Sequence, residues 1–223
     1  MSPPGRPKGE FRSAQHEGTP VSSIAHDHSP IDARASTVLD FWFGRPGDDF
    51  HLQTRKQWFQ KDAAFDAQIA QQFGDLIVAA LRGQLAGWSA QPLTALAQVI
   101  VLDQFTRNTR RGTAGMFAGD ARALATARAL VAAGDDLRMA GVQRQFIYLP
   151  FEHSEALADQ IECLRLFAQL GRDEPALAGL LEWAQKHHDV VARFGRFPHR
   201  NAALGRESTP EEAEFLKQPG SGF

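Results

Sequence analysis

Two segments far apart in the sequence hold most of its unusual polar chemistry. The first, residues 148–155, reads YLPFEHSE, and the second, residues 193–201, reads RFGRFPHRN. Each sets ionisable side chains among large apolar ones, and such groups are costly to bury unless they find partners. We therefore expect the acids of the first segment and the bases of the second to meet across one cleft, as a ligand site or as a structural lock.

A further acid, Asp103, lies in the segment 97–105, which is apolar almost all the way round and is therefore expected to be a buried central helix, and the base Arg107 follows this segment. At about 100° per residue, Asp103 and Arg107 project inward along one line. The simplest interpretation is an ion pair between them. The alternative is that a bound carboxylate or phosphate joins this pair, because the helix ends in side chains that can donate hydrogen bonds to such an anion. These donors are Gln104, Asn108 and Arg111.

A helix expected over residues 151–170 would place His153 on its core face, beside Gln160, and an acidic ladder on another side. The ladder comprises Glu152, Glu155, Asp159 and Glu162. His153 is interpreted as a core histidine held by one hydrogen bond, as a general base or as a metal ligand. The ladder is either solvated or faces the arginines. A di-metal site would need Glu-x-x-His on two helices, and because neither copy is present we expect no metal.

Positive charge is concentrated near the C-terminus, where Gly195 and Pro198 are expected to break a helix and shape a turn. The basic residues of this turn are Arg193, Arg196, His199, Arg200 and Arg206, and Asn201 follows His199 and Arg200. These side chains either pair with the acidic ladder or hold an anion. His187 lies just upstream and is an outside candidate.

Composition excludes several classes of protein. With 223 residues, 43% hydrophobic content and a formal charge of −2, the chain suits one globular domain and lacks the strong positive charge of a general nucleic-acid binder. Its single cysteine, Cys163, excludes an intramolecular disulfide and fits a cytoplasmic protein. No segment has the length and apolar character of a membrane span, so we expect no membrane insertion.

The pattern along the chain predicts helices throughout. Residues 1–36 contain five prolines and few large apolar residues, and we expect a disordered tail there. Residues 37–223 form a single domain of antiparallel helical hairpins, arranged as a stack or as an irregular bundle. Several start and stop signals support this all-α fold. They are caps at Asp62 and Asp120, Pro92 in a first turn, Gly134 at an end, and a capping box from Thr209 to Glu212.

These motifs together resemble a bacterial family known as domain of unknown function 924, from about residue 37 to the C-terminus. The resemblance rests on VLDFWF at 38–43, LDQF at 102–105, PFEHSE at 150–155, and residues 193–206. The family has proline after LDQF where this chain has Thr106, a change expected to relax a local turn. Resemblance implies a TPR-like helical fold but no established activity or cofactor.

Two functions compete. The first is a site for a small anionic molecule, in which arginines fix the ligand and a histidine or glutamate moves a proton. The second is a TPR-like module that binds a peptide, with the charged residues as internal ion pairs; a structural protein without a partner is a variant of it. The proton-transfer candidates are Glu152, His153 and His199. The ligand-binding candidates are Asp103, Gln104, Arg107, Asn108, Arg111, Glu155, Arg193, Arg196, Arg200 and Asn201.

Overall fold

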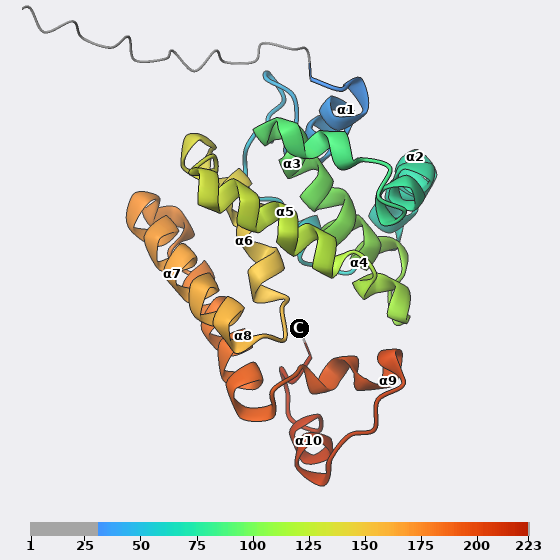
Figure 1. Cartoon of the computed structure of the whole chain (residues 1–223), viewed down its shortest axis with the longest axis vertical. Coiled ribbons are helices and arrows are strands. Elements are labelled where there is room, and N and C mark those ends of the chain that lie inside the picture. Colours follow the sequence, from blue (N-terminus) through green and yellow to red (C-terminus); the bar gives the residue numbers. More distant parts are fainter. Residues whose placement is uncertain (1–30, 223) are drawn as a thin grey trace, which may run out of the picture. The chain divides into compact units, whose positions relative to one another are not determined.

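The computed structural model describes residues 31–222, and helices connected by turns are the regular structure of this part of the chain (Figure 1). The protein is therefore all-α, as the sequence predicts. The helices of the first half are α1 (Ala33–Phe43), α2 (Ala63–Leu81), α3 (Pro92–Val99), α4 (Thr106–Thr109) and α5 (Asp120–Ala133). Those of the second half are α6 (Gly141–Glu152), α7 (Leu157–Asp173), α8 (Leu180–Phe194), α9 (Asn201–Leu204) and α10 (Pro210–Phe215).

Several predicted helix boundaries are confirmed. The Asp62 side chain accepts hydrogen bonds from the first backbone amides of α2, Pro92 occupies the first turn of α3, and Gly134 ends α5 with a φ of 70°. Thr209 and Glu212 form the predicted capping box of α10. Each signal acts locally on unpaired backbone groups at a helix end, which is why the sequence alone reveals it.

Other boundaries differ from prediction. Helix α1 begins at Ala33 rather than 37, because Asp32 caps it and Ala35 is fully buried. The rest of the predicted tail, residues 1–30, lies outside the described residues. Asp120 does not cap α5: Gly119 holds the cap position, and Asp120 is the first helical residue. Its carboxylate is thus available to other partners.

The core is built around an aromatic cluster that joins α1, α2, α6 and the segment after α3. The Trp42 ring lies 5.5 Å from the Phe105 ring and 5.4 Å from the Phe146 ring, both edge to face. Phe73 contacts Phe105 with 4.8 Å between ring centroids. Aromatic rings bury much apolar area, and edge-to-face pairs add to it, so this cluster fixes the central helix that carries the polar residues.

Helices α7 and α8 pack side by side, and the short link between them requires them to run in opposite directions (Figure 1). Beyond the end of α8, the chain forms α9 and α10, drawn in red in Figure 1. This C-terminal segment has its own small apolar cluster of Val190, Val191 and Phe197, with Phe194 and Phe215 packed against it. Its attachment to the central helices therefore depends on polar contacts as well.

Candidate functional site

Asp103 lies in a widened turn of the central helix. Residues Ile100–Phe105 are π-helical, between α3 and α4, and Asp103 is completely buried there. The carbonyl of Leu102, in the same turn, packs against Gly119, where an added Cβ would lie only 2.1 Å from the carbonyl oxygen. Single π-helical turns occur frequently at functional sites. Here the turn brings Asp103 close to the start of α5 without space for a side chain at position 119.

Three side chains bind the buried carboxylate of Asp103. His153 Nδ1 donates to Oδ1 at 2.7 Å, Gln104 Nε2 donates to Oδ2 at 2.6 Å, and Arg107 Nη1 lies 3.0 Å from Oδ1. The predicted ion pair between Asp103 and Arg107 is confirmed. Burial raises the pKa of Asp103, but the charge of Arg107 and the hydrogen bonds from His153 and Gln104 hold it below its usual range. The carboxylate is therefore ionised.

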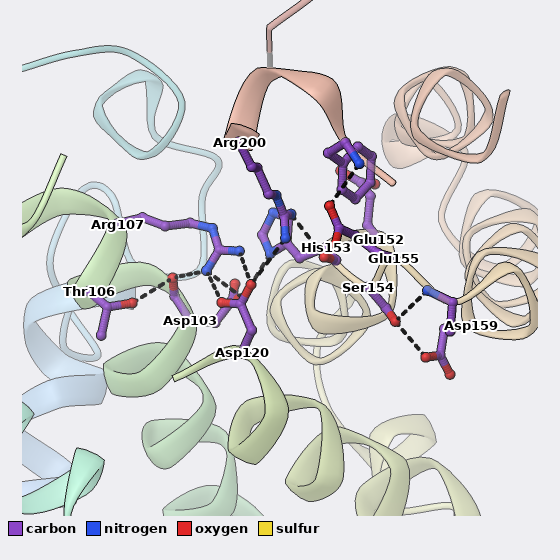
Figure 2. A network of polar contacts seen from close by, with 12 residues as sticks. Asp103, Thr106, Arg107, Asp120, Glu152, His153, Ser154, Glu155, Asp159 and Arg200 are labelled. Atoms are coloured by element: carbon purple, nitrogen blue, oxygen red, sulfur yellow. Dashed lines mark hydrogen bonds and ion pairs between the residues drawn. The ribbon is translucent and has the colours of Figure 1, made fainter. Parts of the chain in front are cut away.

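Asp120 and Arg200 extend this network, and Figure 2 shows both converging with Asp103, Arg107 and His153 from separate elements. Arg107 donates to both Asp120 oxygens, at 2.8 and 3.0 Å, and Arg200 Nη1 lies 3.4 Å from Oδ2. Arg200 Nη2 donates to the His153 carbonyl at 2.9 Å. These five residues are called the central cluster below. They join the central helix, α5, the end of α6 and the C-terminal segment.

Arg200 is held mainly by aromatic faces. Its guanidinium carbon lies 4.7 Å from the Phe117 ring centroid and 4.4 Å from that of Phe197, which are cation–π distances. Its Nε has no hydrogen-bond partner among the described residues. Burial and the charge of Arg107 lower the pKa of Arg200 to about 10, so it remains charged at neutral pH. The guanidinium thus keeps unused donor capacity.

The contact with Asp103 fixes the tautomer of His153. Burial and the charge of Arg107 lower the pKa of His153, so the ring is neutral at pH 7. Because Nδ1 carries the proton that Asp103 accepts, Nε2 presents a lone pair. Nε2 has no hydrogen-bond partner among residues 31–222, and the side chain is 15% exposed. A neutral imidazole oriented by a carboxylate in this way is the arrangement of a general base.

Glu152 is the second candidate for proton transfer. It is buried, with His187 Nδ1 3.4 Å from its Oε1, while the same nitrogen donates to the Trp183 carbonyl at 2.9 Å. Burial and the negative charge of Asp103 raise the pKa of Glu152 to about 8. Burial lowers the pKa of His187 to about 3, and burial with the charge of Arg200 lowers that of His199 to about 4. A neutral carboxylic acid therefore lies beside neutral imidazoles.

Other predicted site residues bind partners outside the central cluster. Asn108 and Arg111 both bind Asp66 of α2, at 2.7 Å each. Arg193 pairs with Glu211 on the surface, at 2.7 Å. Further along, three candidates belong to what we call the C-terminal lock. Its members are Glu155, Arg196, Asn201, Arg206 and Glu212.

The lock joins the C-terminal segment to the turn between α6 and α7. Glu155 accepts from Arg206 at 2.7 and 2.9 Å and from the Phe197 amide at 2.8 Å. Arg196 donates to both Glu212 oxygens, at 2.7 and 2.8 Å, and Asn201 donates to Glu212 at 3.2 Å. The two polar segments thus lie together, through the Phe197 amide with Glu155 and through Arg200 with the His153 carbonyl. The predicted pairing of acids in 148–155 with bases in 193–201 is not found among the described residues, because Arg193, Arg196 and Arg200 pair with Glu211, Glu212 and Asp120 instead.

The predicted helix over residues 151–170, with its acidic ladder, is wrong. Helix α6 runs through Pro150 to Glu152, His153 holds the C-cap position, and α7 begins only at Leu157. Glu152 and Glu155 therefore do not share a helix face with the acids of α7. The chain breaks there because side chains from elsewhere bind the carbonyls of the turn. Thr106, which stands where the family has proline, begins α4, and its hydroxyl donates to the Leu102 carbonyl at 2.8 Å.

Three important residues were not among the predicted site residues: Asp120, Gln160 and Arg206. Asp120 is 80 residues from Arg200 in sequence, so no helical period connects them. The sequence signals were, for Arg206, its place in the basic turn and, for Gln160, a core-facing position in a predicted helix, and both residues lie in motifs of the family resemblance. Tertiary contact rather than spacing determines all three roles.

Three further observations concern metal ions, surface hollows and membrane-spanning helices. Among residues 31–222, no group of three or more His, Cys, Asp or Glu side chains is placed to hold a metal ion. A surface hollow of about 220 Å³ lies away from the central cluster's residues, between the end of α2, α3 and α5. Its lining includes Ser89, Gln98 and Arg122. In the same part of the chain, no helix combines the length and apolar character needed to cross a membrane.

Comparison with known proteins identifies the family. A model of bacterial proteins of unknown function, DUF924, matches residues 38–220. The chain is also similar to the solved structure of ATU0120, a protein of unknown function from Agrobacterium tumefaciens, with 42% identity and a TM-score of 0.72. That match covers 83% of this chain and 97% of the other. No curated protein matches significantly. The chain therefore belongs to the DUF924 family of bacterial proteins of unknown function.

Proposed function

We propose that the central cluster binds a small molecule that carries an acidic group, and that His153 accepts a proton from this molecule or from water beside it. The observation that carries this proposal is the contact between Asp103 and His153. It leaves Nε2 as a lone pair on a partly exposed ring, without a hydrogen-bond partner among the described residues. A histidine needed only for packing would not require a buried carboxylate to orient it.

The charges near His153 support an acidic ligand. Arg200 Nη1 lies 3.4 Å from Asp120, longer than the roughly 2.7–2.9 Å of a strong charge-assisted hydrogen bond. Together with the partnerless Nε, this leaves donors for a carboxylate or phosphate. Glu152, neutral at pH 7, supplies a proton donor close to the base. Proton abstraction with return of a proton, or addition of water, is the chemistry that such a pair performs.

Thermal denaturation of the full chain tests the proposal. Inorganic phosphate, nucleotides and short carboxylic acids are added in turn, since a ligand at 100 times its Kd raises stability by about 2.7 kcal/mol. We expect one class to raise the Tm of the wild type and of Arg193→Ala, which removes a surface arginine of the same segment. Arg200→Ala should stay folded and lose the shift. A shift that survives in Arg200→Ala would place the ligand elsewhere.

His153 is tested with the ligand class found in that experiment. His153→Ala should bind it but form no product, whereas His188→Ala, which removes a partly exposed histidine of α8 outside the central cluster, should behave as the wild type. Product formation is followed by mass spectrometry. Turnover by His153→Ala at the wild-type rate would contradict the role of a general base.

A second candidate is a TPR-like module that binds a peptide. The observation that favours it is the full pairing of Arg107, whose guanidinium binds Asp103 and Asp120 inside the protein. In this function the central cluster only keeps helices in register. It predicts that no small molecule raises the Tm, that Arg200→Ala and His153→Ala both melt at clearly lower temperature, and that a peptide library yields a binder.

A further inference from the structure

The turn that carries His153 has an unusual backbone. Helix α6 ends at His153 with φ −81° and ψ −7°, so no left-handed residue closes it. The last carbonyls of a helix have no partner within the helix, and in a buried turn water cannot replace one. Side chains must therefore bind these oxygens. Their identity determines where His153 is held.

Gln160, in the first turn of α7, supplies most of these donors. Its Nε2 donates to the carbonyls of Glu152 and Ser154, each at 2.7 Å, and lies 3.3 Å from that of Phe151. The carbonyl between them, that of His153, is bound by Arg200. One amide thus binds the residues on both sides of His153.

The side-chain amide of Gln160 hydrogen-bonds only to this turn within the described residues. The side chain is completely buried, and its Oε1 has no hydrogen-bond partner among the described residues. The orientation of the amide is set by its surroundings, because the reverse orientation would place Oε1 against two carbonyl oxygens at 2.7 Å. All its hydrogen bonds within residues 31–222 therefore go to the turn around His153.

We infer that Gln160 is a positioning residue: its amide clamps the turn from Phe151 to Ser154 so that His153 Nδ1 meets Asp103 and Nε2 stays available. Ser154 helps, since its hydroxyl donates to Asp159 of α7 at 2.6 Å. The inference rests on the proposed function, which explains why His153 must be held in place. The contacts of Gln160 with the turn, however, are present in the protein without a ligand. The inference can therefore be tested without a ligand.

The test is NMR of the full chain with labelled histidine, the His153 signals being assigned from their absence in His153→Ala. Gln160→Met keeps the length of the side chain and removes the donor. Gln145→Met is the matched control, because Gln145 is another buried glutamine whose amide atoms have no hydrogen-bond partner among the described residues. Gln160→Glu is a second variant, in which a carboxylate oxygen faces the carbonyls.

In the wild type and in Gln145→Met, we expect an exchange-protected Nδ1–H resonance for His153 and a low pKa. In Gln160→Met and Gln160→Glu, the resonance should be lost and the pKa should move up toward the ordinary value of about 6.5. Folded Gln160 variants with unchanged resonance and pKa would overturn the inference. Failure of both variants to fold would also overturn it, because the amide would then be a general requirement of the fold.

The two proposals can fail separately. If the Gln160 variants release His153 while no ligand or reaction is found, the clamp stands and the proposed function does not. If a ligand is found and His153 is essential for turnover, but the Gln160 variants leave its NMR signals unchanged, the function stands and the clamp is wrong.

Discussion

The central cluster and the C-terminal lock are both dense in charge, yet the pKa values of the proton-transfer candidates at the first shift in the opposite sense to those of the acids in the second. In the lock, pKa shifts favour the charged forms. Hydrogen bonds from Arg196 lower the pKa of Glu212 to about 2, and for Glu155 the bonds from Arg206 outweigh the effect of burial and lower the pKa. At the two proton-transfer candidates, Glu152 and His153, burial favours the neutral forms: it raises the pKa of Glu152 and lowers that of His153, while Asp103 beside them stays ionised.

The two regions also differ in how completely their polar atoms are hydrogen-bonded. In the lock, both oxygens of Glu155 and of Glu212 accept at least one donor, and Asn201 Oδ1 accepts from Arg206 at 2.9 Å. In the central cluster, His153 Nε2 and Arg200 Nε have no such partner among residues 31–222. Complete pairing indicates a structural role, whereas unpaired groups with shifted pKa values indicate a site. Charge density alone does not separate the two.

The largest effect that would test this comparison is on Asp103. Asp103→Asn removes the only charge that is wholly buried in the cluster, and breaking a buried pair costs about 3–5 kcal/mol. We expect the lower end, about 3 kcal/mol, because Arg107 keeps Asp120. The free energy of unfolding in urea measures it. Arg193→Ala, which breaks an exposed pair, should cost less than about 1 kcal/mol. Equal losses would contradict the distinction between interior and surface pairs.

A second large effect concerns Gly119, which packs against the π-helical turn that carries Asp103. Gly119→Ala would place a methyl group against the Leu102 carbonyl and should cost up to about 3 kcal/mol, the top of the usual range for overpacking. Gly179→Ala is the matched control, because its Cβ would meet nothing within 4 Å. It should change stability by less than about 0.5 kcal/mol. Urea unfolding again decides, and a neutral Gly119→Ala would show that the π-helical turn tolerates a shift.

Local signals explain how much of this could be predicted from the sequence. The caps at Asp62 and Thr209 were predictable because a cap binds backbone amides within three residues. The inward pair of Asp103 and Arg107 was predictable because residues four apart share a helix face. The all-α fold follows from the same periodicity.

The remainder depends on contacts that no period encodes. The break after Glu152 contains no glycine, and Pro150, the obvious candidate for a break, lies inside α6. The helix ends where Gln160 and Arg200 bind its carbonyls, and both approach from other elements. Asp120 looked like a cap because its local context suits one, but its carboxylate binds Arg107 instead. The pair of Asp103 with Arg107 was therefore predicted, whereas the role of Asp120 and the contacts of His153 and Arg200 were not.

A third prediction concerns the dependence of protein stability on pH. The folded pKa of Glu152, about 8, exceeds the unfolded value of 4.5, so the folded protein holds a proton that the unfolded chain releases. Its contribution to stability is complete below pH 4.5 and is lost as the pH rises to 8. His187 and His199 have folded pKa values of about 3 and about 4 against 6.5 unfolded, so their contribution is lost as the pH falls below 6.5. Stability should therefore be greatest near pH 6.5.

Glu152→Gln isolates the acidic part of this profile. Between pH 6.5 and 8 the wild type should lose about 2 kcal/mol, since one proton corresponds to about 1.4 kcal/mol per pH unit. The variant should lose much less. Glu182→Gln, at an exposed position of α8, should decline as the wild type does. Urea unfolding at several pH values measures the three proteins, and parallel profiles would show that Glu152 is ionised in the folded state.

The smallest predicted effect concerns the lock. Thr209→Ala removes the side-chain oxygen that accepts from the Glu212 amide at 3.2 Å, and loss of such a cap costs about 1 kcal/mol. Thr113→Ala, an exposed threonine without a capping bond, should cost less than about 0.5 kcal/mol. Because α10 packs on Phe194 through Phe215, the loss should appear as faster hydrogen exchange in α10. If the lock is only structural, the His153 resonances must stay unchanged in Thr209→Ala. A change there would mean that the lock and the central cluster act as one unit, and their opposite pKa shifts would then describe two halves of a single site.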